Sequence, residues 1–269
     1  MSPPGRHGPR RGPSGAPGEH RSAKHEGTPV SEAGARFDRL DALRAVAIVW
    51  MAVFHFCFDL NHYGLIAPRQ NFHTDAFWTI QRTSIVSLFM FCAGLSQAVA
   101  LHTGQGWPRF WRRWAQIAGC ALLVSIGSAW MFPKSWISFG VLHGLAVMLV
   151  LVRLMAPLGV GLWLVGLLAI LAPHLLPHPL FDHAALNWIG LVTRKPITED
   201  YVPVLPWLGA MCWGLAAGQW LLAHQPTLLQ GALPLTLKPL ATLGRWSLSF
   251  YMLHQPLLIA AVMLYLQWR

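Results

Sequence analysis

Long apolar stretches separated by short polar linkers dominate the chain after residue 37. A helix that crosses a bilayer needs about 20 mostly apolar residues, and several segments meet or approach that length. They are residues 40–60, 76–100, 112–132, 137–155, 158–177, 203–223 and 245–267. The linkers contain turn-forming residues, and tryptophans lie near many segment ends, where their half-polar rings suit the membrane interface. The pattern predicts an all-α fold, a polytopic transmembrane helical bundle of about seven spans surrounded by membrane lipid.

The composition is also typical of a membrane protein. Of the 269 residues, 54% are hydrophobic and only 11% are charged, whereas a soluble domain carries about 25% charged residues. The cysteines lie within apolar runs without metal-ligand spacing, and the linker histidines do not have the spacing of a zinc site. We therefore expect no metal ion. The sequence has no Walker, Rossmann or GxSxG motif, which argues against a soluble nucleotide-binding fold.

The net charge of +10 is concentrated near the N-terminus. The basic residues ahead of Asp41 are Arg6, Arg10, Arg11, Arg21, Lys24, Arg36 and Arg39. Nucleic-acid binding is one interpretation of this segment, but it has few aromatic residues and no recognisable nucleic-acid fold. Because it is rich in Gly, Pro and Ser, we favour a disordered basic tail at residues 1–36, followed by a transmembrane domain at residues 37–269. The tail has no apolar core, so it does not resemble a cleaved signal peptide.

The basic residues also predict an orientation, because cytoplasmic loops carry an excess of Lys and Arg. Placing the N-terminus in the cytoplasm puts the basic tail and the loop at 101–113 on the same side of the membrane. Most of the charge difference between the two sides comes from the tail. With seven spans, the C-terminus then lies outside.

The first predicted span carries four ionisable residues, Asp41, Arg44, His55 and Asp59. At about 100° per residue they fall within an arc of roughly 60° on one helical face, spread along about 27 Å. An ionisable group at membrane depth costs at least ~2.5 kcal/mol unless it meets a partner or water, so we expect this face to point into the bundle. The alternative is that Arg44 extends to the membrane surface and Asp59 caps the helix end.

His55 and Asp59 are four residues apart, so their side chains can touch. A carboxylate beside an imidazole is a common arrangement for a general base near neutral pH. Other predicted spans carry polar residues at middle to outer depth, namely Arg82, His143, Asp200, Tyr201, Tyr251, His254 and Gln255. A single histidine in a bundle is more often a packing residue than a catalyst, but three histidines on different spans favour a site.

Five motifs occur in order along the chain: DALRAVAIVWMAVFHFCFDL, FMFCAGLSQ, ISFGVLHGLAV, DYVPVLPWLG and LGRWSLSFYMLHQP. Together, over residues 37–267, they resemble the catalytic domain of the heparan-alpha-glucosaminide N-acetyltransferase family in its short bacterial form. Arg44 followed by His55, and the ending LHQP, also resemble the acyltransferase-3 family. The resemblance implies an integral membrane O- or N-acyltransferase of the bacterial inner membrane. Such an enzyme moves an acetyl (acyl) group from acetyl-CoA at the cytoplasmic face to a hydroxyl or amine of a glycan or glycolipid at the outer face.

The resemblance leaves two candidates for the catalytic histidine. The acyltransferase-3 pattern points to His55, whereas counting back from Gly94 in the heparan-type pattern points to His73. The residues around His73 match that pattern poorly, so we prefer His55, supported by Asp59.

The remaining candidate residues are assigned by their predicted depth. Arg44 and the basic group Arg109, Arg112 and Arg113 are expected to hold the phosphates of coenzyme A. Tyr251, His254 or Arg82 is expected to stabilise the oxyanion at the thioester carbonyl. The expected acceptor-binding residues are His143, Asp200, Tyr201 and Gln255.

Two other functions fit parts of the same pattern. A line of ionisable residues across a membrane also suits a proton path, so a proton-coupled transporter of small solutes is an alternative. A non-catalytic partner in a cell-envelope complex is another, and it predicts that His55→Ala leaves cellular function intact.

Overall fold

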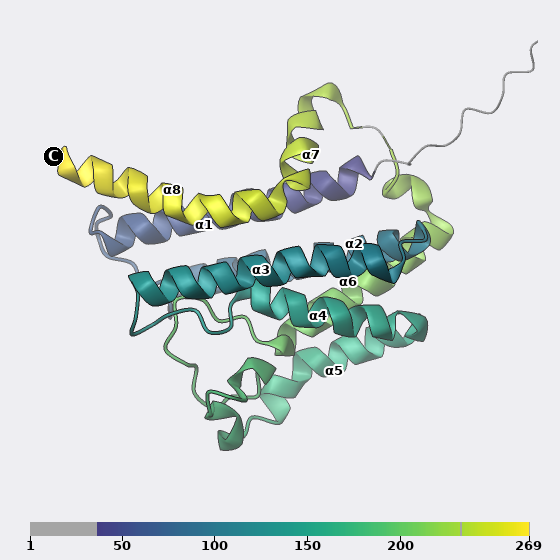
Figure 1. The fold of residues 1–269 in the computed structure, drawn as a ribbon, viewed down its shortest axis with the longest axis horizontal. Helices are drawn as coiled ribbons and strands as arrows, with labels where there is room; N and C mark the ends of the chain where they lie inside the picture. Colours follow the sequence, from purple (N-terminus) through teal and green to yellow (C-terminus); the bar gives the residue numbers. More distant parts are fainter. Residues whose placement is uncertain (1–36, 232, 269) are drawn as a thin grey trace, which may run out of the picture. The chain divides into compact units, whose positions relative to one another are not determined.

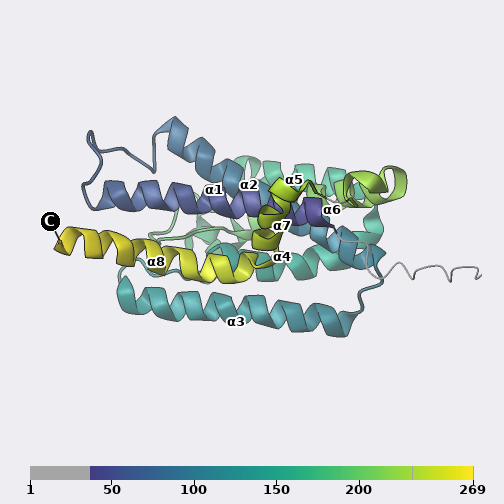
Figure 2. The ribbon, with the colours of Figure 1, turned by 90° about the horizontal axis from the view of Figure 1, so that it is seen from above.

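The computed structural model describes residues 37–231 and 233–268, which form a bundle of long helices (Figures 1 and 2). The main helices are α1 Asp38–His62, α2 Ala76–His102, α3 Trp107–Met131, α4 Val141–Met155, α5 Gly161–Leu175, α6 Val204–His224, α7 Lys238–Arg245 and α8 Ser247–Gln267. Short 3-10 helices lie between them: η1 Ala156–Leu158, η2 Pro179–Asp182, η3 Asn187–Ile189, η4 Pro226–Leu228 and η5 Leu235–Leu237. Within the described ranges the chain forms no strand beyond one isolated β-bridge, so the predicted all-α fold is confirmed. The predicted tail at residues 1–36 lies outside the described residues.

Each of the seven predicted apolar segments coincides with a helix, but not all are full spans. Five helices of the described part are long and apolar enough to cross a membrane: α1, α2, α3, α8, and α4 when it is continued through η1 to Leu158. Helix α5 is apolar but has only 15 residues, and α6 contains the non-helical residue Leu205. The predicted segment 245–267 is also interrupted at its start, because α7 ends at Arg245 and α8 begins at Ser247. Seven spans is therefore an approximation.

Glycine allows α2 and α6 to pack closely along much of their length. A Cβ atom at Gly94 of α2 would overlap the carbonyl oxygen of Met211, and one at Gly214 of α6 would overlap the carbonyl oxygen of Phe91. Small residues serve this purpose in membrane bundles because they let two helix backbones approach. Helix α5 packs along α6 as well, and together these helices contribute much of the buried apolar core.

Helix α1 packs against α2, α7 and α8, which places the first and the last helix of the described chain side by side (Figures 1 and 2). Its contact with α7 is close, because a Cβ atom at Gly244 would overlap the carbonyl oxygen of Asp41. By contrast, α3 and α8 bury only a small part of their apolar surface. Exposed leucine side chains along both helices suit a lipid environment.

Two linkers are joined at the end of the bundle where α4 begins. The backbone N–H of Glu199 donates to the Ser135 carbonyl over 2.9 Å, and a β-bridge pairs Phe139 with Tyr201. This pairing positions the 196–203 segment at the N-terminus of α4. It therefore places Asp200, which is far from α4 in sequence, at the first turn of that helix.

Candidate functional site

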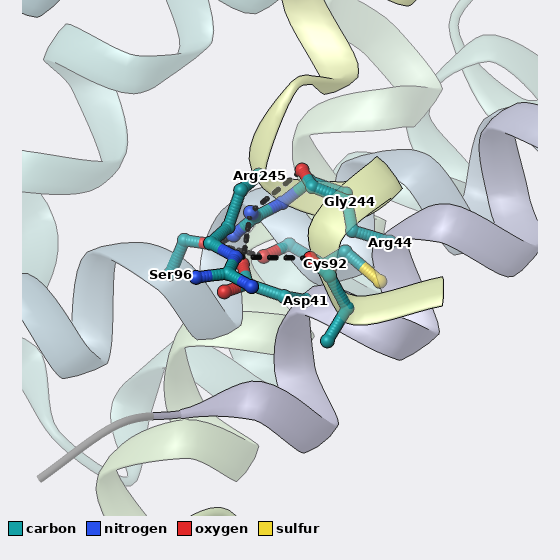
Figure 3. Close-up of polar contacts among 7 residues, drawn as sticks. Asp41, Arg44, Cys92, Ser96, Gly244 and Arg245 are labelled. Atoms are coloured by element: carbon teal, nitrogen blue, oxygen red, sulfur yellow. Dashed lines mark hydrogen bonds and ion pairs between the residues drawn. The ribbon is translucent and has the colours of Figure 1, made fainter. Parts of the chain in front are cut away.

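Arg44 is the centre of a polar cluster where α1, α2 and α7 meet (Figure 3). Its Nη1 atom donates to Asp41 Oδ1 over 2.6 Å, and its Nη2 atom donates to Ser96 Oγ over 2.7 Å. The Ser96 hydroxyl in turn donates a hydrogen bond to the Cys92 carbonyl oxygen over 2.5 Å. The Gly244 carbonyl oxygen lies 3.4 Å from Arg44 Nη1. The guanidinium group is thus held by three helices, and we call this group of residues the arginine cluster.

Two cavities open beside the arginine cluster. The smaller, of about 150 Å³, is lined by Ser96, Gln97, Ala100, Gln105, Phe110, Arg113, Trp114 and Leu149. The larger, of about 750 Å³, lies between α3 and the α7–α8 junction and is lined by Arg113, Ala115, Gln116, Gly119, Cys120, Leu123, Arg245, Trp246, Leu248 and Ser249. Arg113 lines both cavities. Because Arg113 and Arg245 are exposed, their guanidinium groups are accessible to an anionic molecule.

A pair of histidines lies further along α1, where it meets α8. The rings of His55 and His254 have centroids 5.3 Å apart, the Phe54 ring lies edge-on to His55, and the Phe250 ring stacks on His254. His254 Nδ1 lies 2.7 Å from the Tyr251 carbonyl oxygen. A carbonyl oxygen only accepts, so Nδ1 carries the proton and Nε2 keeps a lone pair. Within the described part of the chain, that buried Nε2 atom has no hydrogen-bond partner.

Asp59 has a different partner from the one predicted. Both of its carboxylate oxygens accept from Gln255 Nε2, at 3.0 and 3.1 Å. Among the hydrogen bonds of the described residues there is none between Asp59 and His55. The expected His55–Asp59 pair is therefore not formed, because the carboxylate faces the amide of α8 instead of the imidazole one turn away on α1.

His143 is bonded at both ring nitrogens. Its Nδ1 atom accepts from the Gly140 N–H at 3.3 Å, and its Nε2 atom lies 3.1 Å from Ser125 Oγ. Since the Ser125 hydroxyl donates to the Ile137 carbonyl over 2.7 Å, Nε2 is the donor in the contact with Ser125. The ring thus joins the start of α4 to α3, and neither nitrogen is available as a base in this arrangement.

Asp200 and Tyr201 are also engaged in local structure. Asp200 Oδ2 accepts from the Val141 N–H at the start of α4 over 2.7 Å, and Tyr201 donates to the Asn187 carbonyl over 2.7 Å. Burial raises the pKa of Asp200, and the Val141 N–H and the charges of Lys195 and Arg82 offset part of that rise. Burial raises the pKa of Tyr201 to about 12, so it is a neutral donor at physiological pH.

Arg82 and Lys195 belong to the same polar region as Asp200. Burial lowers the pKa of Lys195, and the positive charge of Arg82 lowers it further.

The other predicted site residues lie apart from the arginine cluster and from the histidine pair. Arg109 and Arg112 are exposed on α3 and line neither of the two cavities. His73 is exposed in the linker between α1 and α2, where its ring packs edge-on against Phe58.

Sequence reasoning missed several residues of these clusters. Ser96 and Gln97 were readable as polar residues within the apolar α2 segment, but nothing in the sequence indicated which helix they face. Arg245 was recognisable only as a basic residue near a span end. Its place beside Arg113 follows from the break between α7 and α8.

The sequence matches the family model for the catalytic domain of heparan-alpha-glucosaminide N-acetyltransferase over residues 36–256. The chain belongs to this family. Membership in the heparan-alpha-glucosaminide N-acetyltransferase family implies acetyltransferase activity within a membrane, and acetyltransferases of this kind use acetyl-CoA as the donor. No curated protein and no solved structure matches the chain. Among the described residues, no group of three or more His, Cys, Asp or Glu side chains is arranged to hold a metal ion.

Proposed function

We propose that this protein transfers an acetyl group from acetyl-CoA, bound in the cavities beside the arginine cluster on the cytoplasmic side, to a hydroxyl or amine of a glycan or glycolipid on the outer side. The observation that carries the proposal is the placement of two clusters along one face of α1. Arg44 and His55 are 11 residues apart, or about 17 Å along the helix axis. A donor held at one end therefore has to reach the histidine pair with its thioester, as the long pantetheine arm of coenzyme A allows.

The cavities beside the arginine cluster fit the chemistry of the donor. Coenzyme A carries several phosphate groups, and the forked guanidinium group binds phosphate through two parallel hydrogen bonds. Arg113 and Arg245 line the larger cavity and are exposed, whereas Arg44 is already bonded to Asp41 and Ser96. We therefore assign phosphate binding first to Arg113 and Arg245, and we assign to Arg44 the role of holding α1, α2 and α7 together around them.

The histidine pair suits proton transfer from the acceptor. The acceptor oxygen or nitrogen attacks the thioester carbonyl, and its proton passes to a histidine. The carbon–sulfur bond then breaks as the histidine gives that proton to the sulfur, which releases coenzyme A as a thiol and leaves the acetyl group on the acceptor. His254 Nε2 carries a lone pair and lies beside His55, so the two rings can share the roles of base and oxyanion donor. Tyr251 and Arg82 remain predicted contributors to oxyanion stabilisation.

The proposal is tested with purified protein in lipid nanodiscs, radiolabelled acetyl-CoA and envelope glycans. We expect label to enter the glycan fraction and coenzyme A to bind in calorimetry. His55→Ala and His254→Ala should each lower kcat by about 10²- to 10⁴-fold, the usual range for a general acid or base. Arg113→Ala and Arg245→Ala should raise KM for acetyl-CoA, and the matched control Arg109→Ala should not.

Failure of both incorporation and coenzyme A binding would contradict the proposal. Solute uptake driven by a pH gradient in proteoliposomes, with no response to acetyl-CoA, would instead support the proton-coupled transporter. Acetyl transfer in proteoliposomes, with acetyl-CoA supplied on one side of the membrane at a time, also tests the orientation. Transfer should occur only when the donor is on the side of Arg113.

A further inference from the structure

Asp59 and Gln255 form a hydrogen-bonded pair that joins α1 to α8 next to the two histidines. Asp59 is only 4% exposed, and both of its carboxylate oxygens accept from Gln255 Nε2. Gln255 directly follows His254 in α8, and Asp59 lies one helical turn beyond His55 in α1. The hydrogen bond between the helices therefore lies beside the contact between the two imidazole rings.

Helix α8 has little else to hold it at this depth. Most of its apolar surface is exposed, and it contains Pro256 directly after Gln255. Proline has no N–H and its ring crowds the preceding turn, so the backbone bonding of a helix is weakened there. The Nδ1 proton of His254 goes to the Tyr251 carbonyl of the same turn and not to another helix. A polar side-chain contact to α1 is thus a main restraint on the rotation of this part of α8.

The hydrogen-bond partner of Asp59 argues against its predicted role as the support of His55. Gln255 Nε2 donates to both carboxylate oxygens of Asp59, whereas the Oε1 atom of Gln255 is buried and has no hydrogen-bond partner among the described residues. The carboxylate of Asp59 is directed at α8 and not at His55. A carboxylate that does not touch the imidazole cannot orient it through a hydrogen bond.

We propose that Asp59 and Gln255 are positioning residues, whose hydrogen bond keeps α8 at the rotation on α1 that places His254 beside His55. The inference rests on the proposed acetyl transfer for its kinetic consequences, but the geometric restraint stands without it. The role requires an acceptor atom at position 59 and an amide donor at position 255. It does not require a negative charge, because an uncharged amide oxygen at position 59 can also accept from the Gln255 N–H.

Kinetic measurements distinguish a positioning role of Asp59 from the role of a charged partner of His55. Asp59→Ala and Gln255→Ala should each lower kcat by about 10- to 100-fold, with KM for acetyl-CoA changed less than about twofold, because the donor binds elsewhere. Asp59→Asn keeps an amide oxygen that accepts from Gln255, so it should retain kcat within about threefold of the wild type. The double variant Asp59→Ala/Gln255→Ala should be no worse than the poorer single variant, since both remove one contact.

Asn61→Ala is the matched control. Asn61 makes two hydrogen bonds to Gln70 at the same end of α1 and does not reach α8, so its loss should leave kcat near the wild-type value. Loss of kcat in Asp59→Asn equal to that in Asp59→Ala would overturn the inference in favour of a charge role. Wild-type kcat in Gln255→Ala would overturn it outright.

A distance measurement tests the restraint independently of any activity. Spin labels at the exposed positions Val53 of α1 and Leu253 of α8, in a variant whose native cysteines are replaced by alanine, report how the two helices are held. The distance distribution should broaden in Gln255→Ala and stay narrow in the variant carrying Asp59→Asn. An unchanged distribution in Gln255→Ala refutes the positioning role even if acetyl transfer is never observed, whereas broadening without acetyl transfer refutes only the proposed function.

Discussion

Replacing Arg44 by alanine leaves Asp41 and Ser96 without their partner at the point where α1, α2 and α7 meet. The side chains of Arg44 and Asp41 are only 22% and 20% exposed, so water replaces the lost contacts incompletely. The remaining carboxylate would then lie partly buried without a counter-charge. Removing one partner of such a pair is more costly than never having had the pair, because the other charge stays desolvated.

The size of the effect follows from the hydrogen bonds of Arg44. Bonds to charged groups contribute about 1.5–3 kcal/mol each. The contacts at 2.6 and 2.7 Å count fully, whereas the one at 3.4 Å to Gly244 is too long to contribute much. Taking the lower value, because both ends are partly hydrated, Arg44→Ala should lose about 3 kcal/mol of unfolding free energy. For a chain of this size that corresponds to a melting temperature lower by about 6–12 °C.

Thermal unfolding in detergent micelles, followed by tryptophan fluorescence, measures this loss. Arg44→Lys should fall between the wild type and Arg44→Ala, because an ammonium group keeps the charge but not the planar fork that meets Asp41 and Ser96 together. The double variant Arg44→Ala/Ser96→Ala should be little less stable than Arg44→Ala alone. Arg109→Ala, on an exposed face of α3, is the control and should change stability by less than about 0.5 kcal/mol. A wild-type melting temperature for Arg44→Ala, or full additivity in the double variant, would refute the reasoning.

Three further predictions concern other parts of the bundle. Gly214→Ala should lower the free energy of unfolding by about 1–3 kcal/mol, because the added Cβ overlaps the α2 backbone. Gly127 has open space around it, so Gly127→Ala should not destabilise the protein, and equal melting temperatures for the two variants would contradict the prediction. Burial raises the folded-state pKa of Asp200 above its ordinary 3.8, so its ionisation costs stability as the pH rises through that range. Asp200→Asn still accepts the Val141 N–H but cannot ionise, so its melting temperature relative to the wild type should increase from acidic to neutral pH. A difference in melting temperature that stays constant with pH would contradict the raised pKa of Asp200. His73→Ala should keep acetyl transfer within about threefold of the wild type, and a loss of 10² or more would make His73 the catalytic base instead.

The positions of the helices were largely predictable from composition along the chain. The segment predicted at 76–100 is α2 at Ala76–His102, and the one predicted at 203–223 is α6 at Val204–His224. The helix positions could be predicted because a helix in a membrane has to be long and apolar whatever its neighbours are. The break between α7 and α8 was not predictable in the same way. It depends on α7 packing against α1, where Gly244 meets the Asp41 carbonyl.

The direction of the polar face on α1 was also predictable. The helical repeat alone places Asp41, Arg44, His55 and Asp59 on one side. In the structure Arg44, His55 and Asp59 contact neighbouring helices, and Asp41 bonds to Arg44 on its own helix. The partner of Asp59 was not predictable. The repeat allows a contact with His55 one turn away, but the carboxylate bonds to Gln255, about 200 residues later in the chain.

The amino-acid sequence was enough to predict a helical membrane bundle, the face of α1 that carries its ionisable residues, and the family that the chain resembles. These properties depend on apolar length, on the helical repeat and on ordered motifs, all of which are local. The packing of the helices was needed to show that Arg44 bonds to Ser96, that Arg113 and Arg245 line one cavity, and that His254 lies beside His55. Contacts between helices depend on how each one is rotated and how deeply it lies, and apolar composition leaves both open because lipid and protein neighbours are nearly equally apolar.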